Sequence, residues 1–499
     1  MTSYALQEHA TGHQMFGNLY KSFTPISCFS ASPLWQIIQQ HYIASGEDAW
    51  NRNIPYAVTN ATLTANYHAK LAFDHARSKP FSPRSYVIVD YGAGIGQHAY
   101  YLALALEKLC KEFDYPLDHF VIYMADISPK CIEYWTNHPQ LGPLFQSQLI
   151  QPLHLKGLWM EDLQTIIDIK HDGLFVVANY LLDSMPFHAF EHQQKQGIQL
   201  STQRKYLTPS FSGPLSSIAL KTAPLSQQHT PDEIETTLHE RYKDIPRYTI
   251  PREAIAFIDQ LFSKTPDTIF VINDKGYLTP EELDYDENFN LTYEGSFSSS
   301  VNLDAITFCL PPHINSYTAG NTSRLKTLII THKTPPLSTL PNCTDTAILY
   351  QLFKSQENLA LSTVESLCKT LNYDPFCLEI VSQSLSPQTT KSCGTLADTL
   401  ERIQKNHFTK KTDYSLLHLA KIMRKTRQFD LSLQYLEYYT HNNQLNGAYY
   451  LELGILQLEM GQLANAEQAL NQALNDPLTH DTASQLIKTL QAQTTSNEY

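Results

Sequence analysis

A glycine-rich turn follows the first strongly apolar run of the sequence. The run Tyr86–Val89 leads into Asp90, and glycine then occupies positions 92, 94 and 96. Glycine at every second position permits backbone conformations that other residues rarely adopt, and it lets a ligand approach the main chain. A helix that begins after such a turn, as the apolar spacing over 97–113 predicts, offers unpaired N–H groups at its start. The turn therefore predicts a ligand-binding loop between a strand and a helix.

Short apolar runs alternate with amphipathic stretches from about residue 86 to residue 333. This alternation is typical of an α/β fold, a parallel sheet with helices on both faces. The expected strands are Tyr86–Val89, Phe120–Met124, Gly173–Ala178, Thr268–Ile272 and Leu325–Thr331. The expected helices around them are Pro33–Ser45, Thr62–Ala76, Gln97–Phe113 and Pro251–Ser263.

Pattern and composition divide the chain into four regions. Residues 1–80 are expected to form an N-terminal helical cap on the substrate side, and residues 81–335 the sheet domain. Within that domain, the stretch 192–250 is rich in Gln, Ser, Thr and Pro and is interpreted as an insertion. Residues 336–394 are predicted to be a helical connector that ends in a linker, and residues 395–499 an all-helical region. The connector helices are expected at Thr346–Phe353, Ser362–Leu371 and Phe376–Leu385.

The last region aligns with itself when it is shifted by 34 residues, which is the period of tetratricopeptide repeats. The shift matches six positions, among them Leu419 with Leu453 and Leu436 with Leu470. Small residues at Gly454 and Ala466 would let two antiparallel helices approach closely. About two repeats are visible, so helices at 395–408 and 481–493 are expected to cap them. The region resembles a protein-binding module; an ordinary helical hairpin is the alternative.

The charge and cysteine content limit the possible partners. Lys plus Arg number 36 against 49 Asp plus Glu, a net charge of −13 without a basic cluster, which disfavours nucleic acid. No apolar run approaches the roughly 18 residues of a membrane span, and Met1–Phe16 has no import signal. Eight scattered cysteines without zinc-ligand spacing are interpreted as reduced thiols, with no metal site. We therefore expect a cytoplasmic protein without membrane association; its oligomeric state is left open.

The spacing of the glycines distinguishes between cofactors. The dinucleotide fingerprint would need glycine at position 97, where Gln97 stands. The pattern D-x-G-x-G-x-G instead resembles the cofactor loop of class I S-adenosylmethionine-dependent methyltransferases, which implies a Rossmann-like sheet and S-adenosylmethionine as cofactor. In that family an acid at the end of the second strand accepts both ribose hydroxyls, which points to Asp126. The expected cofactor-binding residues are Asp90, Tyr91, Gly92, Ala93, Gly94, Gly96, Asp126, Ile127 and Asn179.

A finer resemblance lies at Val176–His188. This stretch is similar to the strand-end motif Ala-Asn-Glu-x-x-Asp-Ala-Leu-Pro-Val of MidA-type methyltransferases, the family that includes the mitochondrial complex I assembly factor modifying a protein arginine. Ile54–Ala61, Val271–Tyr277 and Gly295–Leu303 resemble other family segments in the same order. The resemblance spans about residues 50–335 and implies methylation of a protein side-chain nitrogen, with arginine the first candidate.

Two departures from the family pattern affect this expectation. Tyr180 stands where the family has Glu, and Lys275 stands where it has Tyr. A guanidinium is best oriented by paired N–H···O contacts with carboxylates, so replacing an acid with a phenol removes one such acceptor. Asp183 is the first candidate for the remaining acceptor, with the amide of Asn179 beside it. The alternative for Asp183 is a capping role at a helix start.

Two further side chains are candidates for the chemistry. Tyr180, with Tyr91, is a candidate to present a ring face to the sulfonium. His188 is a candidate to assist deprotonation of a weakly basic acceptor. Packed, purely structural roles are the alternatives. The candidate catalytic residues are Asp183, Asn179, Tyr180 and His188.

The sequence thus predicts an S-adenosylmethionine-dependent methyltransferase that acts on a protein side-chain nitrogen, with a protein recruited by the C-terminal repeats. One alternative keeps the fold and loses the reaction, leaving a scaffold or assembly factor with a vestigial cofactor site. The other is a small-molecule methyltransferase in which the repeats serve only for oligomerisation.

Overall fold

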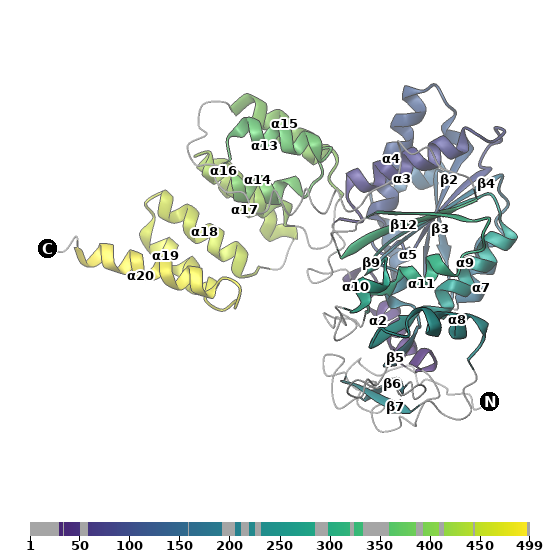
Figure 1. Cartoon of the computed structure of the whole chain (residues 1–499). Helices are drawn as coiled ribbons and strands as arrows, with labels where there is room; N and C mark the ends of the chain where they lie inside the picture. Colours follow the sequence, from purple (N-terminus) through teal and green to yellow (C-terminus); the bar gives the residue numbers. More distant parts are fainter. Residues whose placement is uncertain are drawn as a thin grey trace. The chain divides into compact units, whose positions relative to one another are not determined.

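The structure is a computed structural model that describes residues 29–32, 34–49, 58–157, 159–191, 205–210, 219–224, 231–284, 298–319, 324–332, 359–385, 393–408, 414–442 and 445–496. The chain divides into two compact units (Figure 1). Met1–Asn60 and Thr64–Ala347 form the sheet unit, and Ala61–Leu63 and Ile348–Tyr499 form the helical unit. The expected cap thus groups largely with the sheet, while the boundaries of the four predicted regions stay predictions.

The sheet unit is built on a mixed sheet with the strand order β11-β12-β9-β4-β1-β2-β3, and β10 pairs with β9 off this path. Strands β3, β2, β1, β4 and β9 are parallel, whereas β12 is antiparallel to both of its neighbours. The strands are β1 Tyr86–Tyr91, β2 Phe120–Asp126, β3 Ile150–His154, β4 Gly173–Asn179, β9 Thr268–Tyr277, β10 Val301–Asn302, β11 Asn315–Ala319 and β12 Leu325–Thr331. The five predicted strands and the α/β class are confirmed; β3, β10 and β11 were not predicted.

Helices cover both faces of this sheet. Successive residues of β1 point to opposite faces: Val87 and Val89 pack in the core that contains α9, whereas the Tyr86 hydroxyl meets His75 of α3 and Asp90 meets His98 of α4. The four helices predicted around the sheet are confirmed to within two residues. The helices and 3-10 turns of the central part are η1 Phe29–Ala31, α2 Leu34–Ser45, η2 Gly46–Ala49, α3 Thr62–Ala76, α4 Gln97–Glu112, η3 Leu117–His119, α5 Pro129–Asn137, α6 Gly142–Gln146, α7 Trp159–Ile167, η4 Leu182–Ser184, α9 Arg252–Lys264, α10 Pro280–Asp284 and α11 Leu303–Phe308.

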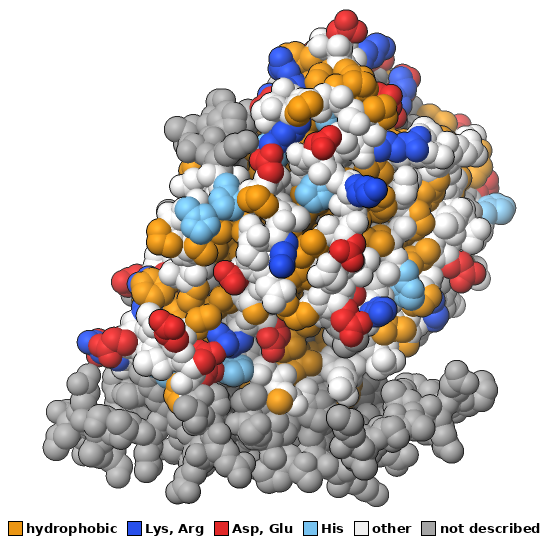
Figure 2. All heavy atoms as spheres, turned by 90° about the vertical axis from the view of Figure 1, so that its right-hand side faces the viewer, with side chains coloured by type: hydrophobic (Ala, Val, Ile, Leu, Met, Phe, Trp, Pro, Cys, Tyr) orange, Lys and Arg blue, Asp and Glu red, His pale blue; other side chains and the backbone are white. Residues whose placement is uncertain are grey.

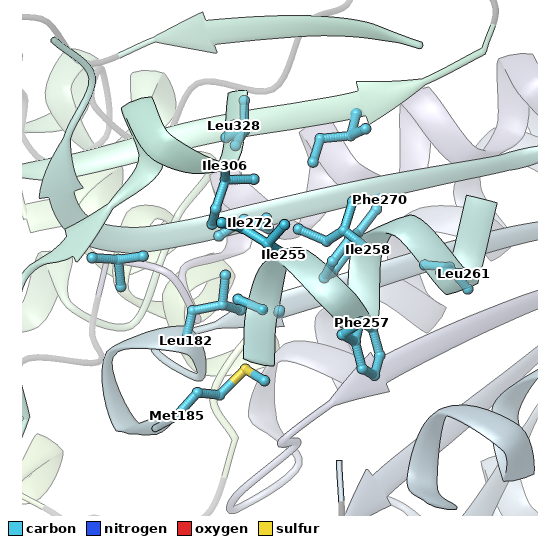
Figure 3. Close-up of a cluster of buried hydrophobic side chains, with 14 of the residues drawn as sticks. Leu182, Met185, Ile255, Phe257, Ile258, Leu261, Phe270, Ile272, Ile306 and Leu328 are labelled. Carbon is cyan, nitrogen blue, oxygen red and sulfur yellow. The ribbon is translucent and has the colours of Figure 1, made fainter. Parts of the chain in front are cut away.

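Helix α9 anchors the core on one face of the sheet (Figure 3). Its apolar residues Ile255, Ile258 and Leu261 recur at helical spacing, and all three are buried against β9 and β12. Burying each such side chain contributes roughly 1.5–3 kcal/mol to folding. Leu182 and Met185, which follow β4, enter the same cluster. The segment after β4 is therefore fixed by this core.

The predicted insertion forms part of a second, four-stranded antiparallel sheet with the order β7-β6-β5-β8. Its elements are β5 His188–Glu191, β6 Lys205–Ser210, β7 Ala219–Pro224, α8 Glu233–Arg241 and β8 Arg247–Ile250. Asp232 caps α8, since its carboxylate accepts the backbone N–H of Glu235 at 2.8 Å. Residues 192–204, 211–218 and 225–230 lie outside the described residues.

The described part of the helical unit consists of α13 Leu361–Thr370, α14 Cys377–Ser384, α15 Cys393–Lys405, α16 Ser415–Lys425, α17 Phe429–Asn442, α18 Gly447–Glu459, α19 Leu463–Ala473 and α20 His480–Ser496. Helix α16 packs on α17, and α18 packs on α19 (Figure 1). The second helices of these pairs begin at Phe429 and Leu463, 34 positions apart. The predicted helix Thr346–Phe353 lies outside the described residues.

A buried ion pair joins the two helix pairs. The guanidinium of Arg424 on α16 donates to both carboxylate oxygens of Glu452 on α18, at 2.6 and 3.3 Å, and it also contacts Glu459. The side chains of Arg424 and Glu452 are each 9% exposed. When two charges are buried to this degree, removing one leaves the other buried without a partner, and this destabilises the structure strongly.

Charged side chains are mixed on the face of the molecule drawn in Figure 2. Lysine and arginine alternate there with aspartate and glutamate, and no large patch of one sign forms. This face therefore lacks the basic stripe that a phosphate backbone would need. Of the helices that the structure describes, none is long and apolar enough to cross a membrane.

We predict that Arg424→Leu lowers the free energy of unfolding of the helical unit by about 3 kcal/mol or more, because it leaves the Glu452 carboxylate buried without a partner. The double variant Arg424→Leu, Glu452→Leu should lose less. Urea unfolding followed by circular dichroism measures both. Lys405→Leu is the matched control, since its pair with Glu401 is exposed. A double variant less stable than Arg424→Leu would contradict the prediction.

Candidate cofactor site

The candidate site lies at the carboxyl edge of the central sheet. The chain leaves β1 for β2 on one side, whereas β4 pairs with the other side of β1, so the strand order reverses between β1 and β4. Ligands bind outside the carboxyl ends of the strands at such a reversal. The glycine turn follows β1, Asp126 ends β2, and Asn179 ends β4. The fold thus brings the three predicted motifs to one edge.

The glycine turn needs its glycines. Gly92, Gly94 and Gly96 have φ values of +78°, +55° and +81°, which other residues adopt only with strain. A Cβ on Gly96 would lie 2.3 Å from the methyl carbon of Met124, so no larger side chain fits there without a shift. The indole N–H of Trp135 donates to the Gly94 carbonyl at 2.8 Å. The turn is therefore closely packed against Met124 of β2 and is held in place by Trp135 of α5.

Asp126 faces this turn. Its carboxylate accepts the backbone N–H of Gly94 at 3.0 Å on one oxygen and that of Ser128 at 2.9 Å on the other. Burial raises the pKa of this carboxyl from 3.8 to about 6, although the hydrogen bonds oppose the rise. Each carboxylate oxygen can accept a further hydrogen bond. Asp126 is thus positioned to accept two hydroxyl donors.

Two pockets meet beside the turn. The first, of about 300 Å³, has the glycine backbone on one wall and the end of β4 on the other. The second, of about 700 Å³ including its mouth, lies over Asp126. They share Gly92 and Tyr180. The first pocket is lined by Thr59, Asn60, Asp90, Gly92, Ala93, Gly94, Ile95, Asn179 and Tyr180. The second includes Ile38, Gln39, Tyr42, Tyr91, Asp126, Ile127, Leu155, Gly157, Trp159, Leu181 and Ser184.

The first pocket contains a polar atom without a partner. Asn179 is 8% exposed, and its Nδ2 makes no hydrogen bond within the described residues, while its Oδ1 accepts from Asn273 at 2.8 Å. Asp90, which also lines this pocket, is 2% exposed, and its Oδ2 lies 3.2 Å from Nδ1 of His98. A buried donor without a partner is costly, and a bound ligand can satisfy it. The pocket therefore offers one N–H donor and one acid.

Tyr180 stands where the two pockets join. Its φ of +49° is left-handed, a conformation that costs a non-glycine residue about 1–2 kcal/mol and that occurs often at functional sites. Its backbone N–H donates to the Asn273 carbonyl at 2.9 Å, and its side chain packs with Val58 and Leu325. The tertiary structure holds this strained backbone in place.

Asp183 lines neither pocket. It lies in η4, where its carboxylate accepts the Ser184 hydroxyl at 3.0 Å and sits 3.6 Å from the Lys275 ammonium. The Lys275 ammonium also donates to the Ser298 hydroxyl at 2.5 Å, and Asp274 accepts the Asp183 backbone N–H at 3.1 Å. Burial raises the pKa of Asp183, and the Lys275 charge opposes the rise. The proposed acceptor role of Asp183 stays a prediction, and the carboxylate already has a cationic partner.

The two other candidates have different positions. His188 lies on β5, where its Nδ1 is 2.5 Å from a carboxylate oxygen of Glu235, and it lines neither pocket. Tyr91 lines the second pocket, but its ring stacks on Phe257 and its hydroxyl has no partner among the described residues. Burial raises the pKa of Tyr91 well above 10. The predicted roles of His188 in deprotonation and of Tyr91 beside the sulfonium therefore stay predictions.

Sequence reasoning missed the segment after β3. Leu155, Gly157 and Trp159 line the second pocket, and Asp162 fixes the segment by accepting the backbone N–H groups of Lys156 at 2.7 Å and Gly157 at 2.9 Å. Recognising β3 would have placed these residues at the same edge as Asp126. Helix α2 was predicted as a helix, but its pocket-lining role had no local signal.

Comparison with known proteins finds a family that the central part of the chain resembles. Residues 73–300 match the model of a family described as "Putative S-adenosyl-L-methionine-dependent methyltransferase". The crystal structure of an uncharacterized ACR superfamily protein from Burkholderia thailandensis is similar at 15% identity, covers 57% of this chain and 73% of its own, and has a TM-score of 0.39. The comparison with curated proteins found no match. The matched region is thus similar to a family described as putative S-adenosylmethionine-dependent methyltransferases, and S-adenosylmethionine is the cofactor that this similarity implies.

Proposed function

We propose that this chain transfers a methyl group from S-adenosylmethionine to a nitrogen of a protein side chain, and that the helical unit recruits the protein. The observation that carries the proposal is the meeting of two chemically different pockets at Tyr180. The resemblance of Val176–His188 to the MidA-type motif adds the protein acceptor.

The residues of the pockets fit the two ends of S-adenosylmethionine. In the first pocket Asp90 is placed to bind an ammonium group, and the unpartnered N–H of Asn179 is placed to bind a carboxylate. In the second pocket Asp126 is placed to accept the ribose hydroxyls, and Ile127 and Leu155 offer apolar surface for the base. The first pocket would thus suit the amino-acid end of the cofactor, and the second pocket would suit its nucleoside end.

The sulfonium joins these two ends, so it belongs where the pockets join. Gly92 and Tyr180 are the residues that both pockets share. When bound, the cofactor supplies a methyl carbon that is already activated for attack. The chain's own task is then to orient the acceptor and to exclude water, which is how such sites accelerate transfer. Tyr180 is positioned for this task, and an aromatic ring face attracts a neighbouring cation.

The contacts of Asp183 bear on the acceptor. Arginine is the first candidate by resemblance, yet binding a guanidinium requires free carboxylate oxygens. The Lys275 ammonium lies 3.6 Å from Asp183, and Tyr180 replaces the family Glu. Both features lower the negative charge on the acceptor side. They favour an uncharged side-chain nitrogen over the guanidinium of arginine as the methyl acceptor. The proposal therefore names a side-chain nitrogen and does not name arginine.

Recruitment by the helical unit is supported by its pairs of antiparallel helices. The 34-residue offset between α17 and α19 matches the period of tetratricopeptide repeats, which commonly bind proteins. On α17, Leu431 and Tyr438 lie seven positions apart and are 41% and 58% exposed. Residues seven apart share one face of a helix, so α17 presents an apolar stripe.

We predict that the affinity for S-adenosylhomocysteine is constant above about pH 7 and falls about tenfold per pH unit below about pH 6. The folded-state pKa of Asp126 is raised to about 6, so the carboxylate loses its ability to accept both hydroxyl donors as the pH falls through that value. Asp126→Asn should weaken binding by about 1.5–3 kcal/mol and remove the pH dependence. Isothermal titration calorimetry measures both effects.

The control for this experiment is Glu133→Gln, which changes an exposed acid of α5 and should leave the pH profile intact. A wild-type protein that binds no S-adenosylhomocysteine would support the vestigial scaffold. An Asp126→Asn variant that keeps the wild-type profile would contradict the role of this carboxylate.

We further predict that incubation with methyl-labelled S-adenosylmethionine and a lysate of the protein's own cells labels a protein, and that Leu431→Ser with Tyr438→Ser reduces this labelling at least several-fold without changing S-adenosylhomocysteine affinity. Hydrolysis of the labelled band identifies the methylated amino acid. Phe81→Ser is the control, since Phe81 is exposed on the sheet unit. Label confined to small molecules would contradict the protein acceptor and favour the small-molecule alternative.

A further inference from the structure

A chain of buried polar side chains runs from the helices on one face of the sheet to the first pocket. Asn273 on β9 lies at its centre: its Nδ2 is 2.8 Å from Oδ1 of Asn179 and 3.2 Å from Nε2 of His68 on α3. His68 Nδ1 is in turn 2.8 Å from Nε2 of His98 on α4. Asn273 and His68 are fully buried, and His98 is 1% exposed. Nothing in the proposed chemistry so far uses these three residues.

The hydrogen bonds of this chain have one consistent direction. The Thr327 hydroxyl donates to Oδ1 of Asn273 at 2.8 Å, so the two N–H groups of that amide serve His68 and Asn179. Nε2 of His68 then accepts, which places the proton of a neutral imidazole on Nδ1. This proton is donated to Nε2 of His98.

The direction continues to the acid of the pocket. Because Nε2 of His98 accepts, its proton lies on Nδ1, which is 3.2 Å from Oδ2 of Asp90. Neither atom has a hydrogen-bond partner among the described residues, so this contact is electrostatic and does not have hydrogen-bond geometry. Burial and the neighbouring His98 hold the pKa of His68 well below 6.5, which keeps this imidazole neutral. At one end, this network therefore directs the Nδ1–H group of His98 toward Asp90.

The other end of the chain fixes Asn179. Since Oδ1 of Asn179 accepts from Asn273, the amide cannot turn over without losing a buried hydrogen bond. The Nδ2 group is then the atom left without a partner, and Asn179 lines the first pocket together with Asp90 of the neighbouring strand. One network thus contacts both the donor and the acid of this pocket.

We propose that Asn273 and His68 are positioning residues that give the first pocket its selectivity for a zwitterionic α-amino-acid group. This inference rests on the proposed function, in which that group is the methionyl end of the cofactor. The Asn179 N–H binds the carboxylate and Asp90 binds the ammonium. The side chains of the network reach only the first pocket; the second pocket, which takes the nucleoside, meets Asn273 only through the backbone bond from the Tyr180 N–H to the Asn273 carbonyl.

The separation of the two pockets allows a sharp test. S-adenosylhomocysteine carries both the nucleoside and the amino-acid end, whereas 5′-methylthioadenosine carries the nucleoside and lacks the amino-acid end. Asn273→Asp removes the donor to Asn179, so the amide turns and presents its oxygen to the pocket. We expect about a tenfold or larger loss of affinity for S-adenosylhomocysteine and a change of less than about twofold for 5′-methylthioadenosine, measured by calorimetry on the full chain.

Variants of His68 provide a matched pair. Gln at this position can accept from Asn273 and donate to His98, so His68→Gln should restore most of the affinity, whereas His68→Leu should lose it selectively. Thr327→Val, which removes the donor to Oδ1 of Asn273, is the variant to use if Asn273→Asp does not fold. Thermal unfolding of each variant establishes that it is folded before binding is measured.

The possible outcomes distinguish a failure of the positioning role from a failure of the proposed methyltransferase function. Equal losses for both ligands, or no loss for either, would overturn the positioning role and leave the cofactor assignment standing. A wild-type chain that binds neither ligand would overturn the proposed function together with this inference. A loss confined to S-adenosylhomocysteine, restored in His68→Gln, supports it.

Discussion

The bond between the Gly94 backbone N–H and the Asp126 carboxylate couples the two motifs on which the site depends. The Gly94 carbonyl also accepts the indole N–H of Trp135, so both the N–H and the C=O of Gly94 are held by side chains. The carboxylate in turn is fixed by Ser128. Because the turn forms a wall of the first pocket and Asp126 a wall of the second, this bond sets the distance between them. A loop free to move would not keep the two pockets joined at Tyr180.

Much of the central fold could be predicted because parallel strands that are buried on both faces are continuous apolar runs. Strands β1, β4 and β12 are buried at every position, and the sequence marks them clearly. Strand β3 lies at the edge of the sheet, contains Pro152 and is exposed at alternate positions, so its signal is weak. The four-stranded sheet was missed because its pairing is set by tertiary contacts that no local pattern encodes.

The same difference applies to the site. The glycine turn and Asp126 are local features whose chemistry depends on their place at a strand end, and the sequence contains that information. The approach of α2 depends on a hydrogen bond from Gln39 to the Gly157 carbonyl, between residues more than a hundred positions apart. Asp183 is close to Asn179 in sequence, yet the short turn between them directs it toward Lys275. Proximity in a motif therefore did not predict proximity in the pocket.

The departures from the family pattern have a common physical consequence. In methyl transfer the positive charge of the sulfonium spreads over sulfur, methyl and acceptor as the new bond forms. A carboxylate beside the sulfonium would stabilise the localised charge of the reactant at least as well as the spread charge, whereas an aromatic face attracts cationic charge without a formal negative charge. Tyr180 lines both pockets, and Lys275 lies 3.6 Å from Asp183, the acid that the family motif retains. Under the proposed function, the two replacements act in the same direction: both favour an acceptor that arrives without a charge of its own.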